Sequence, residues 1–170
     1  MYAIDNLDSV FELEDVPQSS VGAPCPLILC GEQFLHLAYV VQADLAGWDG
    51  RTVRIVSQDT PDENCALVRF QSPRAHMFGP PNDEAFTGHP LAGRGLQPYS
   101  VAEVKNSSWI RTLERMNSVH PHHRKEEYLK LKHFIFAFHD SIFECVSKGF
   151  SVSVQRGSVS SVLRESWPEG

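Results

Sequence analysis

The chain has 170 residues, of which 42% are hydrophobic and 21% are charged, and this composition excludes disordered and fibrous proteins. No apolar run approaches the roughly 18 residues of a membrane-spanning helix. The formal net charge of −6 disfavours non-specific nucleic-acid binding, which requires a surplus of Lys and Arg. We therefore expect one soluble domain over residues 1–170, with neither a membrane nor a nucleic acid as its partner.

The charges are unevenly distributed along the chain. Residues 1–65 contain two basic and eleven acidic residues, a net charge of −9, and the remaining residues carry +3. We expect the two parts to attract each other within the fold. Complementary patches between two copies of the chain, in a homodimer, are the alternative.

Cysteine usage and the first residues indicate a compartment. The four cysteines include no CxxC pair, which disfavours a structural zinc site, and we expect no metal or other cofactor. Cys30 and Cys145 lie in apolar runs, where a free cysteine typically behaves as a small buried hydrophobe. Residues 1–15 are acidic and lack the apolar stretch of a secretory signal. These features favour a reducing, cytoplasmic setting.

The first third of the chain predicts a loose lead-in followed by a hairpin. Residues 1–24 are expected to be loosely structured, with one edge strand over 10–16 and a loop rich in Ser, Gly and Pro after it. Strands over 27–30 and 33–41 are joined at Gly31, because a two-residue type II′ turn needs a positive φ at its first position. The second strand is apolar on both faces and is therefore expected to be central.

The middle of the chain alternates between strand and loop signals. Asp49-Gly50 predicts a turn before a strand over 51–57, and the alternation over 65–71 predicts a half-buried strand. Residues 72–99 contain five prolines and four glycines, which excludes regular structure there. The apolar side chains inside this segment argue for an ordered loop that is fixed to the body of the protein; they are Phe78, Phe86, Leu91 and Leu96.

The last third predicts the main helix and a strong hairpin. Residues 106–108 supply N-cap types for a helix, and a capping box at Ser100 is the alternative start. Pro121 ends the helix in either case, and a short polar helix over 122–130 follows. Strands are predicted over 133–139, 142–147 and 150–155, and residues 156–170 are expected to be frayed. The fold class is α+β, with a largely antiparallel sheet of six or seven strands and one main helix.

One candidate site lies at the tip of the hairpin over 133–147. His139, Asp140 and Ser141 occupy the tip, and Glu144 follows in the returning strand. An imidazole, two carboxylates and a hydroxyl at one end of a sheet suit acid–base chemistry or metal binding. The alternative is that Asp140 and Ser141 stabilise the turn by bonding to its backbone.

A second candidate lies in the Pro- and Gly-rich loop. Residues 82–84 supply two carboxylates, and His89 and Arg94 follow, so the loop is suited to bind a cation or an anionic group. A solvated loop with a weak surface ion pair is the alternative. We interpret the histidines at 120, 122 and 123 as an exposed helix end and the NSS sequence at 106–108 as a helix cap.

Three sequence blocks resemble those of a family of small, uncharacterised bacterial proteins. They are GHPL at residues 88–91, NSSWI at 106–110 and FxFHDSxFEC at 136–145. The resemblance covers roughly residues 80–147. It implies a bacterial, cytosolic single domain and implies no mechanism.

Two functional hypotheses follow from the sequence. The first is a non-enzymatic binding or interaction module whose partner is a small molecule or a protein. The second is a small enzyme or ligand-binding domain with a pocket between the 79–99 loop and the 139–144 hairpin tip. The candidate ligand-binding residues of that pocket are His89, Arg94, His139, Asp140 and Glu144.

Overall fold

The computed structural model describes residues 2–42 and 54–168 and arranges their strands in two antiparallel sheets. The five-stranded sheet has the order β1 (Ser9–Glu12), β6 (Val101–Lys105), β7 (Lys132–Ala137), β8 (Ile142–Ser147) and β5 (Ala75–Gly79). The four-stranded sheet has the order β2 (Leu27–Cys30), β3 (Leu35–Val40), β4 (Glu63–Gln71) and β9 (Gly149–Gly157). The α+β class and the antiparallel pairing are confirmed, whereas the predicted sheet of six or seven strands is matched only in part, because the strands of the described residues divide between two sheets.

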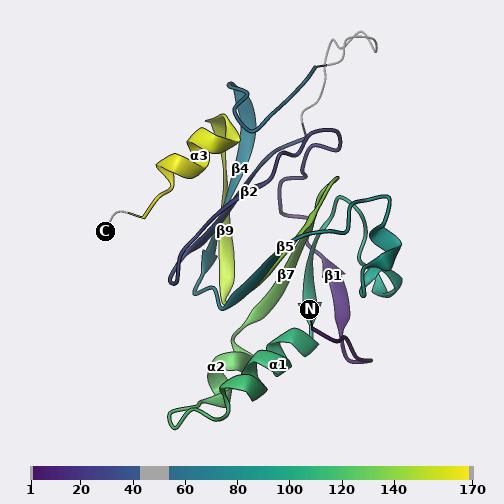
Figure 1. The fold of residues 1–170 in the computed structure, drawn as a ribbon, viewed down its shortest axis with the longest axis vertical. Coiled ribbons are helices and arrows are strands. Elements are labelled where there is room, and N and C mark those ends of the chain that lie inside the picture. Colours follow the sequence, from purple (N-terminus) through teal and green to yellow (C-terminus); the bar gives the residue numbers. More distant parts are fainter. Residues whose placement is uncertain (1, 43–53, 169–170) are drawn as a thin grey trace.

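The chain passes from one sheet to the other at two neighbouring places, which form a common bend. β4 continues into β5 through residues 72–74, and β8 continues into β9 through Lys148. The Lys148 amide donates to the Gln71 carbonyl, and the Arg74 amide donates to the Val146 carbonyl, each at 2.8 Å. The paired strands therefore change sheets together, as corner strands do in packed sheets. The bend brings the two sheets face to face (Figure 1).

The main core lies between the two sheets. The predicted face of Phe134 and Phe136 on β7, together with Phe138 directly after the strand, points into it, and all three side chains are buried. Phe70 from the other sheet meets Phe136 edge to face, with ring centroids 6.0 Å apart. Because such rings bury large apolar areas, replacing a core phenylalanine by alanine typically costs about 3–5 kcal/mol.

Helix α3 (Val159–Glu165) covers the outer face of the four-stranded sheet. Ser158 and Ser161 form a capping box at its start, and Val162 packs on this face, where Leu67 of β4 is completely buried. The prediction of a frayed segment over 156–170 is therefore wrong for the helical part. Because α3 covers this face, β4 is buried on both faces, whereas its sequence alternation predicts a half-buried strand.

Two groups of elements cover the outer face of the five-stranded sheet. The short 3₁₀ helices η1 (Phe86–Gly88) and η2 (Ala92–Arg94) lie over one part, and Phe86, Leu91 and Leu96 are buried there as predicted, whereas Phe78 is 40% exposed. The prediction that residues 72–99 lack regular structure is wrong, because β5 forms within them. The helices α1 (Ser108–Asn117) and α2 (Lys125–Leu129) lie at the end opposite α3 (Figure 1).

Helix α1 begins where the cap signal predicts. The Ser107 hydroxyl accepts the Ile110 amide, and the alternative start at Ser100 is wrong because β6 occupies residues 101–105. The hairpin β2–β3 is also confirmed, but its loop has four residues, since Cys30 pairs with Leu35. A Cβ on Gly31 would lie 2.6 Å from the Phe34 ring, so a close approach, not a positive φ, accounts for this glycine.

The remaining predictions on the strands have mixed outcomes. The predicted edge strand over 10–16 is β1, which ends at Glu12, and β9 matches the strand predicted over 150–155. Residues 54–57 form no strand, and the turn at 47–50 and residues 51–53 lie outside the described residues. Cys30 is exposed, contrary to expectation, whereas Cys145 is buried. Within the described part of the chain, no helix has the length and apolarity needed to cross a membrane.

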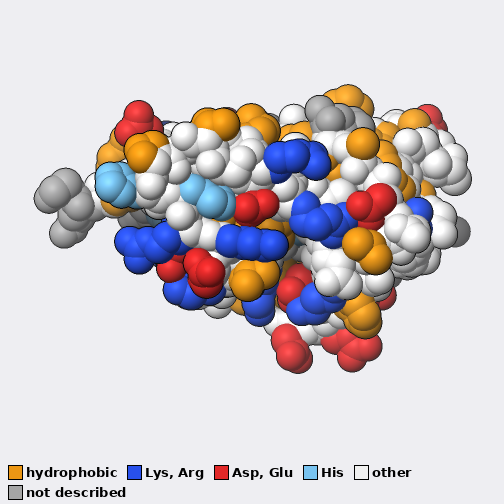
Figure 2. Space-filling view, turned by 90° about the horizontal axis from the view of Figure 1, so that it is seen from below, with side chains coloured by type: hydrophobic (Ala, Val, Ile, Leu, Met, Phe, Trp, Pro, Cys, Tyr) orange, Lys and Arg blue, Asp and Glu red, His pale blue; other side chains and the backbone are white. Residues whose placement is uncertain are grey.

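The end of the molecule that carries α1 and α2 displays many basic side chains (Figure 2). Arg74 and Arg124 line one hollow at this end. A neighbouring hollow is lined by further cations, namely Lys105, Arg111, Lys130 and Lys132. Basic side chains thus gather at this end, although the whole chain carries −6.

Candidate functional site

The structure places the five predicted ligand-binding residues at three locations. His89 and Glu144 meet each other, with His89 Nε2 3.3 Å from Glu144 Oε1. Arg94 instead donates to the backbone carbonyl groups of residues 5 and 8 in the N-terminal segment. His139 and Asp140 lie together at the hairpin tip, where His139 Nε2 is 3.9 Å from Asp140 Oδ1.

Glu144 is the centre of a buried polar network. Its Oε2 accepts a hydrogen bond from the Tyr2 hydroxyl at 2.7 Å and another from His133 Nε2 at 2.8 Å. His133 Nδ1 in turn lies 2.9 Å from the Ser107 hydroxyl. His89 completes the shell around the carboxylate. Each of these side chains comes from a different segment, so the network joins the N-terminal segment, the loop before β6, the cap of α1, β7 and β8.

The hydrogen bonds define where protons lie in this network. The Leu91 amide donates to His89 Nδ1 at 3.1 Å, so the proton of a neutral His89 ring lies on Nε2 and points at Glu144. Burial raises the pKa of Glu144, but hydrogen bonds from His133, His89 and Tyr2, together with the electrostatic attraction of His133, outweigh burial and lower it to about 2. Glu144 is therefore an ionised carboxylate inside the protein.

The network is closed to solvent. The side chains of His133, His89 and Glu144 are 0%, 3% and 7% exposed, respectively. A substrate has no direct access to them, and their contacts satisfy one another, which indicates a role in holding segments together. The three sequence blocks noted above meet here, because they contribute His89, Ser107 and Glu144.

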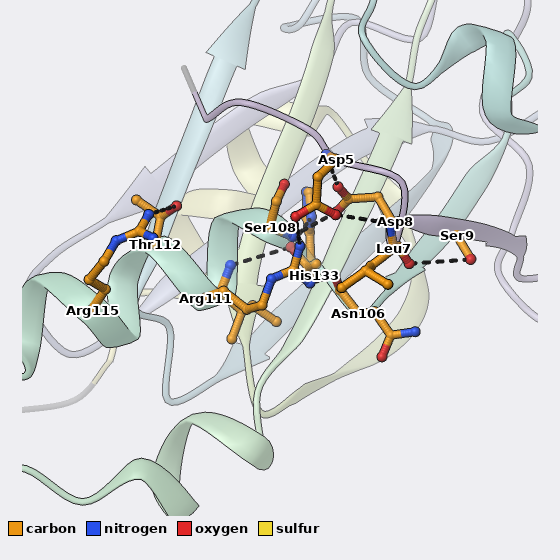
Figure 3. A network of polar contacts seen from close by, with 12 residues as sticks. Asp5, Leu7, Asp8, Ser9, Asn106, Ser108, Arg111, Thr112, Arg115 and His133 are labelled. Atoms are coloured by element: carbon orange, nitrogen blue, oxygen red, sulfur yellow. Dashed lines mark hydrogen bonds and ion pairs between the residues drawn. The ribbon is translucent and has the colours of Figure 1, made fainter.

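The N-terminal segment is fixed to the start of α1 (Figure 3). The buried Asp8 accepts the Ser108 amide at 2.7 Å, and Asp5 forms an ion pair with Arg111. A carboxylate at a helix N-terminus satisfies free amides and interacts favourably with the helix dipole. The predicted attraction between the acidic and basic parts of the chain occurs here. The residues before β1 are therefore held more firmly than the expected loose lead-in, and no sequence signal singled out Asp8.

A second polar cluster lies where the 79–99 loop reaches the hairpin tip. The Tyr99 hydroxyl donates to Asp83 Oδ2, and His139 Nδ1 lies 2.9 Å from the same oxygen. The Asp83 carboxylate raises the pKa of Tyr99 to about 12, so the phenol keeps its proton. Because a carboxylate only accepts, Nδ1 of His139 carries a proton and a neutral ring leaves Nε2 free to accept. The side chain of His139 is 39% exposed.

The third arrangement is a cationic groove between the α1–α2 connection and the bend after β4. We define the cationic groove by its lining polar residues, Arg74, Asn117, His122, Arg124 and Tyr128. Its volume is about 490 Å³, which lies within the range of small-molecule sites. Glu127 and Leu131 complete the lining.

The charges of the cationic groove are not balanced by the residues around it. Glu127 is already matched by Lys130 Nζ at 2.7 Å and Lys148 Nζ at 3.6 Å. Its hydrogen bond to Lys130 lowers the pKa of Glu127, which therefore stays ionised. Within the described residues, the guanidinium groups of Arg74 and Arg124 have neither a hydrogen bond nor an ion pair. Two positive charges thus line the groove unpaired, and the carboxylate in the same lining, Glu127, is already shared with Lys130 and Lys148.

The histidines near the α1–α2 connection divide between two roles. His123 Nε2 lies 2.8 Å from Glu114 Oε1, which fixes it against α1. His120 and His122 are exposed, as the predicted helix end requires. Over residues 2–42 and 54–168, no group of three or more His, Cys, Asp or Glu side chains is arranged to hold a metal ion.

Sequence reasoning missed both arginines of the cationic groove. They are 50 positions apart in the sequence and approach only because β5 pairs with β8 and α2 packs beside α1. No local pattern indicates such a meeting.

Comparison of the chain with protein-family models, with curated proteins and with solved structures finds no match.

Proposed function

We propose that this protein is a binding module that takes a small anionic ligand in the cationic groove. The observation that carries this proposal is the pair of unmatched guanidinium groups, Arg74 and Arg124, at one cavity. Side chains of Asn117 and Tyr128 add neutral hydrogen-bond donors to the same lining. This proposal is the sharper form of the binding-module hypothesis drawn from the sequence.

The physical chemistry of arginine favours an anionic ligand. A guanidinium group is planar, remains charged and offers five donors in a fork that matches phosphate and carboxylate oxygens. Hydrogen bonds between ionised partners are stronger than those between neutral ones. Glu127, the carboxylate in the lining, is shared with Lys130 and Lys148, which reduces its repulsion of an anion.

An NMR titration with inorganic phosphate at neutral pH and low ionic strength tests the proposal. We expect the wild-type protein to bind phosphate and the variants Arg74→Ala and Arg124→Ala to bind about tenfold more weakly or worse, because each loses charge-assisted hydrogen bonds. Arg115→Ala is the matched control. Arg115 is an exposed cation near the end of α1 that carries Asn117, and its guanidinium group donates to the Thr112 hydroxyl at 3.3 Å.

The control separates a site from a general attraction. If Arg115→Ala weakens phosphate binding as much as the groove variants do, the binding reflects overall charge and the proposal fails. Wild-type protein that binds no phosphate also overturns it. A change of less than about twofold for Arg115→Ala, beside large losses for both groove variants, supports it.

One observation favours a second candidate function, acid–base chemistry at the hairpin tip. Asp83 Oδ2 lies 2.9 Å from His139 Nδ1, and His139 Nε2 lies 3.9 Å from Asp140 Oδ1. A carboxylate on Nδ1 is the arrangement that orients the ring of a general base. Nitrogen-15 NMR of the His139 ring tests it, since the neutral ring is expected to carry its proton on Nδ1. A proton on Nε2 would exclude this role.

We also propose that the protein works in a reducing, cytoplasmic environment. The four cysteines are free thiols in the structure, which supports the reducing, cytoplasmic environment inferred from the sequence.

A further inference from the structure

We infer that the ligand of the cationic groove is a small organic phosphate, a monoester whose apolar group lies beside α1. This inference rests on the proposed function and specifies its ligand. It comes from a second hollow that adjoins the cationic groove. The lining of this second hollow consists of Arg74, Leu113, Met116, Asn117 and Tyr128.

The two hollows adjoin each other. Arg74, Asn117 and Tyr128 line both of them. The second hollow has a volume of about 270 Å³, and its remaining lining residues, Leu113 and Met116, are apolar. A ligand that fills both parts therefore meets cations and donors at one end and apolar side chains at the other.

The donor set favours a phosphate over a carboxylate at the cationic end. Two guanidinium groups, an amide, a phenol and the His122 ring offer more donors than the two oxygens of a carboxylate accept. A phosphate monoester presents three terminal oxygens and a charge of about −1.5 to −2 at neutral pH. Its charge matches that of Arg74 and Arg124 together.

The apolar end has exposed surface that such a ligand would cover. The side chain of Met116 is 68% exposed, although it projects from a helix whose neighbouring apolar residue Leu113 packs against the core cluster of Trp109. An unbranched thioether adapts to ligands of different shape. Covering it with the alkyl part of an ester removes apolar area from water, and each buried methylene improves affinity about fourfold.

The test compares inorganic phosphate with n-hexyl phosphate by NMR titration of the same protein. We expect n-hexyl phosphate to bind about tenfold more tightly or better, because several of its methylenes cover Leu113 and Met116. Met116→Gln keeps the length of the side chain but makes it polar. It should remove most of this preference. Val119→Gln, at a residue that is 88% exposed outside the hollow, should keep the preference.

The outcomes separate this inference from the proposed function. If both phosphates bind equally and Arg74→Ala weakens both, the cationic groove is an anion site and the inference about the apolar group is wrong. If neither binds, both proposals fail. If the preference for n-hexyl phosphate survives Met116→Gln, the alkyl chain binds elsewhere and the inference is also wrong.

Discussion

Replacing Glu144 by glutamine tests the role of the buried network most sharply. The substitution keeps the size of the side chain and removes its charge. The Tyr2 hydroxyl, His133 Nε2 and His89 Nε2, which surround the carboxylate at 2.7, 2.8 and 3.3 Å, then face a neutral amide. The amide presents an NH₂ group to one of these donors, so at least one buried hydrogen bond is lost.

The magnitude follows from the pKa of Glu144. Its ordinary value is 4.5, and the folded protein lowers it to about 2. This difference corresponds to about 3 kcal/mol of stability. Because the folded-state pKa is the lower one, this contribution is present above pH 4.5 and is lost as the pH falls towards 2. We therefore expect Glu144→Gln to lower the free energy of unfolding by about 3 kcal/mol at neutral pH.

Urea denaturation followed by tryptophan fluorescence measures this effect. The difference between wild type and Glu144→Gln should shrink as the pH falls from 4.5 to 2. Glu114→Gln is the matched control, because Glu114 also has a histidine partner at 2.8 Å but lies nearer the surface. We expect that control to lose less than about 1 kcal/mol. Equal losses for the two variants, or a pH-independent difference for Glu144→Gln, would refute the reasoning.

Three further predictions concern α3, the hairpin tip and the thiols. Ser158→Ala should lower the free energy of unfolding by about 1 kcal/mol in the same urea assay, because it removes the cap of α3; an unchanged value would contradict the capping role. Asp83→Asn should lower the pKa of Tyr99 from about 12 towards 10 in an NMR titration, since the carboxylate acceptor is lost. Alkylation followed by mass spectrometry should label the exposed Cys30 in the folded protein and Cys145 only after unfolding, because burial raises the pKa of Cys145 to about 12.

The elements that the sequence predicts well have strong local signals. The alternation of phenylalanines over β7 has the period of a strand with one buried face, and Ser107 supplies a helix cap of the preferred type. Helix α3 also has a local signal, but the high serine content of its segment led to the prediction of a frayed tail. Val159, Val162 and Leu163 follow helical spacing after a capping serine, although the surrounding segment is rich in serine.

The division into two sheets has no comparable signal. It depends on bends at residues 72–74 and at Lys148, where short polar segments redirect two paired strands. Candidate sites depend on this topology. The sequence suggested His89 and Glu144 separately as ligand-binding residues, but the register of β8 and the packing of η1 decide that they meet in a closed network.

Whether the chain forms a homodimer stays a prediction. The acidic and basic parts of the chain, whose charge asymmetry suggested the homodimer, pair partly within the fold, since Asp5 forms an ion pair with Arg111. Further basic side chains lie at the end that carries α1 and α2, where the cationic groove is found.

The most direct test of the central claim is an NMR map of the residues that respond to inorganic phosphate. The account predicts that the side-chain signals of Arg74 and Arg124 shift most, together with those of Asn117 and Tyr128, and that the His133 ring in the closed network does not respond. Shifts centred on another part of the surface, or an even response of exposed lysines and arginines without Arg74 and Arg124 standing out, would contradict it.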